Sequence, residues 1–119
     1  VGTAINPELM RALIAGGMAM GLSLASREAF YYDENGIPKA PNLRTYKLLH
    51  IGQEPEYRVG LVETPETDAP YGVRSYAEHG IIGIPAALAN ALSAAFGQEF
   101  FTLPLKPEQL WRDAKEGQA

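Results

Sequence analysis

The stretch Gly72-Val-Arg-Ser-Tyr-Ala-Glu78-His-Gly80-Ile-Ile-Gly83-Ile-Pro85-Ala-Ala-Leu-Ala-Asn90 decides how the rest of the chain is organised. A glycine-bearing loop presents one carboxylate, Glu78, and two further glycines precede a helix. Proline suits the first helical turn, where its missing N–H has no intrahelical partner, so Pro85 predicts a helix over 85–96. Small apolar residues then recur at helical spacing and predict a core-facing stripe: Leu88, Ala91, Leu92, Ala95 and Phe96.

A second helix is predicted upstream, over residues 7–25. Asn6 is a suitable N-cap and Pro7 a suitable first residue. Residues 12–26 carry no charge, but this stretch is shorter than the roughly 20 residues that span a bilayer. Its three glycines weaken an exposed helix and allow other segments to touch its backbone. We therefore expect a long buried helix; a helix that lines a ligand is the alternative.

Four segments have strand patterns. Apolar and aromatic residues flank Asn35-Gly36, a strong hairpin signal, and predict strands at 28–33 and 37–40. Residues 57–63 alternate with period two, and 99–103 is a short apolar run. Pro107 opens a last helix that should bury Leu110 and Trp111. Together these elements predict an α+β fold, with the two main helices packed on a small, mainly antiparallel sheet.

Composition narrows the function classes. A chain of 119 residues is one domain by the usual prior, and 46% hydrophobic residues indicate a globular protein. The net charge of −4 argues against a nucleic-acid partner. The absence of cysteine excludes disulfides and thiolate chemistry, and with two histidines we expect no metal site built from protein ligands alone. We expect a cytoplasmic protein with no membrane partner, because no signal peptide is visible.

An ordered set of landmarks then makes the chain recognisable. They are Ala4-Ile-Asn-Pro7, Gly16-Gly17 with Gly21, Tyr32-Asp33 to Gly36, Asn42 with Tyr46-Lys47-Leu48, Pro70-Tyr-Gly72, Glu78 to Ala91, Leu103-Pro104-Leu105 and Pro107-Glu108. In this order and spacing they resemble the carboxyl-terminal end of the large subunit of molybdenum hydroxylases. These enzymes include xanthine dehydrogenase, aldehyde oxidase and aerobic carbon monoxide dehydrogenase. The resemblance covers essentially all 119 residues.

The resemblance implies a role for the chain in a larger enzyme. Family members hydroxylate a carbon centre with oxygen from water, using molybdenum held by a molybdopterin-type cofactor. Two electrons then pass to iron–sulfur and FAD subunits or domains. A glutamate at the position of Glu78 acts as the general base, which fits carboxylate chemistry beside a metal-activated oxygen. Residues 1–119 would be a single domain at the C-terminal end of the molybdopterin-binding subunit, with the rest of that subunit as its partner.

Two departures from the family pattern affect these expectations. The family often has Gly-Gln, whose amide contacts the cofactor, where this chain has Ala12 and Leu13. It tends to have Gly-Val-Gly where this chain has Ser75-Tyr76-Ala77. We therefore expect the isolated chain to carry no molybdenum, to be inactive and to self-associate through its apolar first helix. The alternative is a non-catalytic interaction or assembly domain derived from that fold. The sequence does not indicate the substrate.

Overall fold

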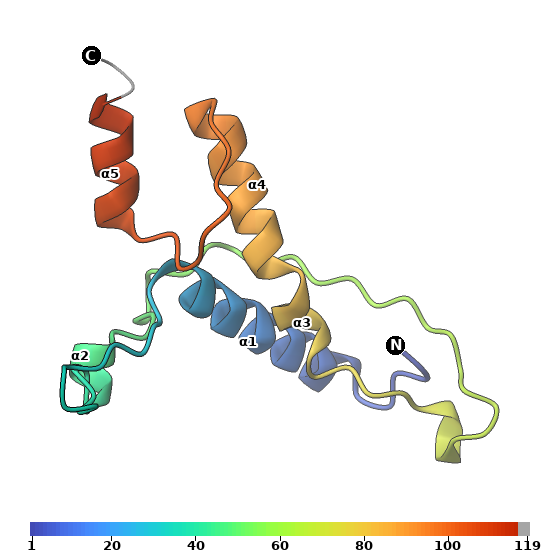
Figure 1. Cartoon of the computed structure of the whole chain (residues 1–119). Helices are drawn as coiled ribbons and strands as arrows, with labels where there is room; N and C mark the ends of the chain where they lie inside the picture. The colour runs from blue at the N-terminus through green and yellow to red at the C-terminus, as the bar shows by residue number, and fades with distance from the viewer. Residues whose placement is uncertain (117–119) are drawn as a thin grey trace.

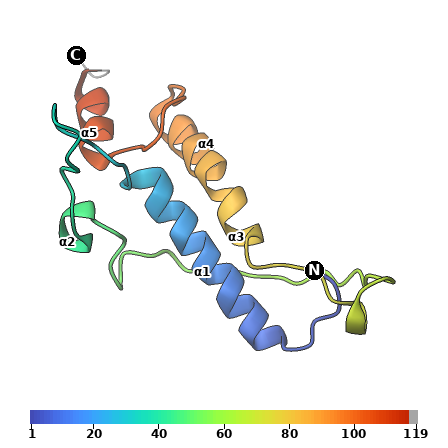
Figure 2. The same ribbon diagram turned by 60° about the horizontal axis from the view of Figure 1, so that its bottom comes forward.

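The computed structural model describes residues 1–116, which form helices joined by long irregular segments (Figure 1). In chain order the elements are α1 (Pro7–Ser26), α2 (Leu43–Tyr46), the 3-10 helix η1 (Pro70–Gly72), α3 (His79–Ile82), α4 (Ile84–Phe96) and α5 (Pro107–Glu116). Helix α1 lies across α3 and the start of α4, while α2 and the hairpin before it extend to one side (Figures 1 and 2).

The helices predicted over 7–25 and 85–96 and the one opened by Pro107 are confirmed, together with the residues that begin them. The expectation that the first is a long buried helix is wrong, because Leu9, Leu13 and Met20 of α1 are 52%, 45% and 61% exposed. Asn6 caps α1, where its side-chain Oδ1 accepts a hydrogen bond of 3.0 Å from the Leu9 N–H. Pro85 lies in the first turn of α4. This helix ends at Gly97, whose φ of 68° is the left-handed conformation that glycine adopts without a Cβ clash.

Glycines on two helices let α1 and α3 touch backbone to backbone. A Cβ added to Gly80 in α3 would collide with the Ile14 carbonyl and lie 2.9 Å from the Met18 amide nitrogen, both in α1. A Cβ on Gly17 would lie 3.2 Å from the Ala77 carbonyl oxygen, and one on Gly21 would lie 2.9 Å from Ile84 Cβ. A Cβ at Gly80 or Gly21 would come closer to a neighbouring atom than real Cβ atoms do, so these two glycines fix where α3 and the start of α4 sit on α1, and Gly17 packs closely beside them.

The predicted sheet is wrong, because no strand forms in residues 1–116. The hairpin at 28–33 and 37–40 has the expected turn, but its pairing is limited to one antiparallel bridge between Tyr32 and Pro38. Asp33 N–H donates to the Ile37 carbonyl at 3.0 Å, and Lys39 N–H to the Tyr31 carbonyl at 2.8 Å. Pro38 has no N–H and Pro41 follows soon after, so the ladder cannot extend through this arm.

The segments 57–63 and 99–103 are extended but form no strand ladder. The first is held only near its end, where the Val62 carbonyl accepts a 3.0 Å hydrogen bond from the Val1 ammonium. In 57–61 every second side chain is half-buried, as the period-two pattern predicts, yet no other strand of the described residues lies beside it. The Tyr57 hydroxyl is buried and has no hydrogen-bond partner. Burial, and to a lesser extent the nearby Glu54 carboxylate, raises the pKa of Tyr57. The sequence pattern identified strand-like backbone correctly, but a strand also needs a neighbour.

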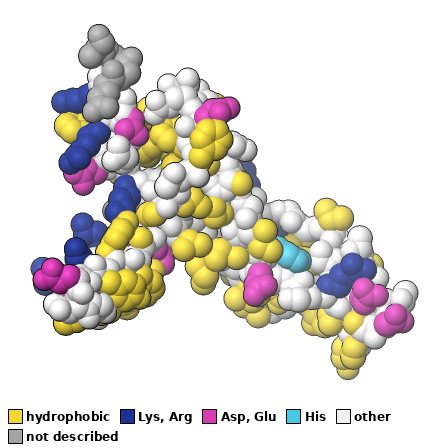
Figure 3. All heavy atoms as spheres, viewed as in Figure 1, with side chains coloured by type: hydrophobic (Ala, Val, Ile, Leu, Met, Phe, Trp, Pro, Cys, Tyr) yellow, Lys and Arg dark blue, Asp and Glu magenta, His cyan; other side chains and the backbone are white. Residues whose placement is uncertain are grey.

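The described chain is open rather than compact. Its radius of gyration is 18.1 Å, whereas a compact chain of this length has about 13.5 Å. Its accessible surface is 8801 Å², about 2,500 Å² more than the roughly 6,300 Å² expected for a folded monomer of this mass. Hydrophobic side chains are spread over the visible face (Figure 3). Among the residues whose side chains the structure describes, only three hydrophobic ones are buried: Met10, Ala25 and Leu105.

The expected core positions of the later helices are correspondingly wrong. No residue of α4 is buried, and of the predicted stripe only Leu88 and Leu92 are half-buried, while Ala91, Ala95 and Phe96 are exposed. In α5, Trp111 is 58% exposed and Leu110 is half-buried. These helices have apolar faces that the described residues cover only in part.

The glycine contact gives a test with a matched control. Gly80→Ala should lower the free energy of unfolding by about 1–3 kcal/mol, because the new methyl group meets rigid backbone of α1. Gly16→Ala should raise it by roughly 0.5–1 kcal/mol, since a Cβ at Gly16 meets nothing within 4 Å and alanine favours the helix. Chemical denaturation of both variants checks this; equal effects would contradict the close contact at Gly80.

Candidate functional site

Glu78 lies directly before α3, where the glycine contact fixes its backbone. Its carbonyl accepts hydrogen bonds from Ile81 N–H at 3.2 Å and Ile82 N–H at 3.4 Å. Its side chain makes no capping bond, and the ion pairs of the described residues do not involve it. Glu78 is exposed, so its main chain is anchored while its carboxylate is free to meet a group from outside residues 1–116.

The loop that leads to Glu78 is held at its other end as well. The Thr3 N–H donates to the Gly72 carbonyl at 2.8 Å, and a Cβ on Gly2 would collide with the backbone of residues 72–74. Arg74 also pairs with Glu66 at 3.1 Å, an exposed ion pair that contributes little. Residues 73–78 therefore connect two close backbone contacts, one at Gly72 and the other at Gly80.

An open cleft of about 440 Å³ lies along this loop. Its lining residues come from the start of the chain and from the loop: Thr3, Ile5, Asn6, Met10, Val73, Arg74, Ser75 and Tyr76. Two residues of the stretch Ser75-Tyr76-Ala77, which departs from the family pattern, are thus placed in its wall: Ser75 and Tyr76. Ala77, the third, points its carbonyl oxygen toward Gly17. The carboxylate of Glu78 itself does not line this cleft.

Leu13 lies on a different surface, the open face of α1. It is 45% exposed, and the residues that share its face at helical spacing are Leu9, Gly16, Met20 and Leu24. All are apolar, so this face offers no side-chain hydrogen bond to a pterin. Neither Leu13 nor Glu78 lines the cleft along the loop.

These observations test whether the described residues could hold a molybdenum cofactor. No group of three or more His, Asp or Glu side chains that could hold a metal ion occurs among the described residues. Leu13 cannot replace the amide that the family pattern has there. Residues 1–116 therefore have neither a metal-ligand set of three such side chains nor the amide that the family pattern has at Leu13. What fits the expected chemistry is one anchored, unpaired carboxylate.

Two helical stretches have the length and apolarity of membrane spans. They are Pro7–Ser26 and His79–Phe96, with a mean hydropathy of 1.4 each. Core helices of soluble proteins have the same length and composition, so this is weak evidence for a membrane. The helix Pro7–Ser26 packs against α3 and α4 through its glycines, so in this structure it is a packing helix.

Comparisons with known proteins identify the class. Residues 1–55 match the family model of the molybdopterin cofactor-binding domain. The xanthine dehydrogenase molybdenum-binding subunit of Escherichia coli is 35% identical over 113 residues, covering 94% of this chain and 15% of that protein. This chain is thus a molybdopterin-binding-type segment, similar over most of its length to a small part of a much longer subunit.

Solved structures agree with this class. Quinoline 2-oxidoreductase from Pseudomonas putida superposes with a TM-score of 0.84 and 30% identity, covering 97% of this chain and 15% of that one. CO dehydrogenase from Oligotropha carboxidovorans gives 0.82 at 22% identity with the same coverage, which shows the fold alone. The chain belongs to the molybdopterin-binding part of the molybdenum hydroxylases. This confirms the resemblance that the sequence landmarks carry.

Proposed function

We propose that this chain is the C-terminal domain of a molybdopterin-binding subunit and supplies Glu78 as general base to an active site completed by other segments. When bound, the molybdenum cofactor would supply the redox chemistry and accept two electrons from the substrate. The Glu78 carboxylate would accept the proton that a water-derived oxygen loses as it attacks the substrate carbon. The observation that supports this is the anchored main chain and unpaired carboxylate of Glu78.

The anchoring matters because a general base must be held within hydrogen-bond reach of the proton it takes. Gly80 sits on α1 at a distance that no side chain permits, and Gly72 is tied to Thr3 two residues from Val1. The loop between them can therefore move little at its ends. To position a general base, this segment needs a rigid backbone and a side chain that is free to reach the proton.

A second candidate is a non-catalytic interaction or assembly domain of the same fold. Leu13 is the observation that favours it, because an apolar residue replaces the cofactor-binding amide on a wholly apolar helix face. In this case Glu78 would be an ordinary exposed loop carboxylate. The two candidates differ in whether the charge of Glu78 affects turnover.

The partners we propose follow from the open fold. The excess accessible surface of about 2,500 Å² is on the scale of one partner's share of a large obligate interface, since such interfaces bury roughly 2,000–5,000 Å² summed over both partners. The rest of the large subunit is the partner of best fit, and iron–sulfur and FAD subunits or domains would receive the electrons. We place the assembled protein in the cytoplasm and propose no nucleic-acid or membrane partner.

The isolated chain should self-associate and carry no molybdenum. Its exposed α1 face would otherwise remain in contact with water. In analytical ultracentrifugation we expect dimers or larger species, and Met20→Glu, in the middle of that face, should shift them toward monomer. Val62→Glu changes an even more exposed apolar residue outside that face and should have little effect. A monomeric wild-type chain, or stoichiometric molybdenum in it, would contradict this.

In the complete enzyme, Glu78→Gln should lower turnover by about 10²–10⁴-fold and leave molybdenum content unchanged. Glutamine has nearly the same shape but cannot accept a proton at neutral pH. The measurement is turnover per bound molybdenum, with Glu34→Gln, an exposed glutamate in the hairpin turn, as the control. Equal activity of wild type and Glu78→Gln would support the interaction domain instead.

Leu13→Gln should increase molybdenum retention if Leu13 marks a lost cofactor contact. The matched control is Leu9→Gln, one helical turn earlier on the same exposed face, which should leave retention unchanged. The measurement is metal content after purification of the complete enzyme. An equal rise in both variants would indicate a general effect of polarity on this face rather than a restored contact.

A further inference from the structure

A second cleft lies where the end of α1, the region of α2 and the start of α5 meet. Its volume is about 310 Å³, and its lining residues, within 26–47 and 106–108, are distant from Glu78 in the sequence. Three cationic side chains line it, Arg27, Lys47 and Lys106, each from a different segment. In the space-filling view, Lys and Arg side chains lie on both sides of the notch between α5 and the α2 region (Figure 3). Sequence reasoning missed this cluster because its members are far apart in the chain.

The cleft is built by one of the few buried contacts of the molecule. The Leu105 N–H donates a 2.6 Å hydrogen bond to the Ala25 carbonyl near the end of α1, and both residues are buried. This bond fixes the start of α5 beside the end of α1. The next residue, Lys106, has its Nζ 4.3 Å from the centroid of the Tyr31 ring, a cation–π distance that holds the ammonium at the rim.

Lys47 occupies a position that suits glycine better. It is the C-cap of α2, with φ 66° and ψ 61° in the left-handed region, and its N–H donates to the Leu43 carbonyl at 3.0 Å. A residue with a Cβ is strained there, and glycine or asparagine is the usual choice. Strain of this kind is retained where the side chain has a use.

The cations of this cleft lack acidic partners. Among the side chains of residues 1–115, no carboxylate lies within ion-pair distance of Arg27, Lys47 or Lys106. Glu108 at the rim is paired with Arg112 at 2.6 Å. The Arg27 Nη1 donates to the neutral Gln53 Oε1 at 2.8 Å.

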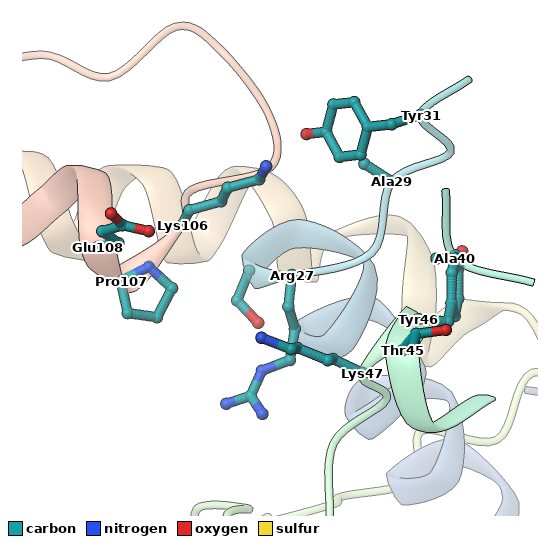
Figure 4. A pocket seen from close by; sticks show the side chains of 11 residues that line it. Arg27, Ala29, Tyr31, Ala40, Thr45, Tyr46, Lys47, Lys106, Pro107 and Glu108 are labelled. Carbon is teal, nitrogen blue, oxygen red and sulfur yellow. The ribbon is translucent and has the colours of Figure 1, made fainter. Parts of the chain in front are cut away.

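Figure 4 shows the Lys47 side chain extending toward that of Arg27 from the opposite wall. Like charges that face one space repel each other, and an anion between them removes the repulsion. A planar guanidinium beside ammonium groups is a typical set of phosphate ligands.

We propose that this cleft binds an oxyanion of the phosphate class. Arg27 would donate its remaining guanidinium N–H groups, and Lys47 and Lys106 would provide point charges. The proposal does not depend on the role of Glu78, because the two regions share no lining residue. The cleft is large enough for a phosphate group with a small substituent.

The test titrates inorganic phosphate into the assembled protein by calorimetry at constant ionic strength. Wild type should bind phosphate saturably and at least tenfold more tightly than acetate. Lys47→Gly should weaken phosphate binding at least tenfold while the thermal midpoint stays equal or rises, because glycine suits the left-handed cap. Arg27→Gln should also weaken binding. Arg44→Gln, which removes a cation of α2 outside the cleft lining, should change affinity less than twofold.

Three results would overturn the proposal. They are the absence of saturable phosphate binding to wild type, an unchanged affinity in Lys47→Gly, and equal affinities for phosphate and acetate. A purely structural Lys47 would give a more stable glycine variant with unaltered phosphate binding, so the two readouts separate structure from recognition.

Discussion

The contact between Gly80 in α3 and the backbone of α1 around Gly17 is the constraint on which the rest of the structure depends. A helix crossing at this distance excludes every side chain larger than hydrogen from the contact point. It fixes the position of α3, the direction in which α4 leaves it, and the end of the loop that carries Glu78. Few other buried contacts exist in the described residues, so the arrangement has little to compensate for its loss.

The open surface and the free carboxylate have a common physical origin. Residues 1–116 contain helices with apolar faces and an extended segment with strand-like alternation, but they lack the layers that would cover and pair them. A fold of two or three packed layers buries such faces, and here one layer is present. This agrees with a chain that spans about 15% of the relatives it matches. Glu78 is likewise exposed, and the ion pairs of the described residues do not involve its carboxylate.

The two candidate sites differ in how the sequence encodes them. Glu78 follows from a local signal, since the glycines that anchor its loop are its near neighbours in the chain. The cationic cleft has no local signal, because Arg27, Lys47 and Lys106 are brought together by the bond between Leu105 and Ala25. Only Lys47 has an unusual local feature, because it is a lysine at a helix end where glycine is expected. Helix α2 is too short to recognise from periodicity, so the sequence alone does not reveal this feature.

The sequence by itself determined the three longer helices α1, α4 and α5, the residues that begin them, and the family. Asn6, Pro7, Pro85 and Gly97 act through bonds and torsions within one or two turns, so their effects can be read from neighbouring residues alone. Only the tertiary structure decided that 57–63 and 99–103 form no sheet and that the stripe of α4 is uncovered. A strand needs a partner for its backbone hydrogen bonds, and a core needs a second face to bury the first. Both depend on residues distant in the chain or outside it, which local periodicity cannot report.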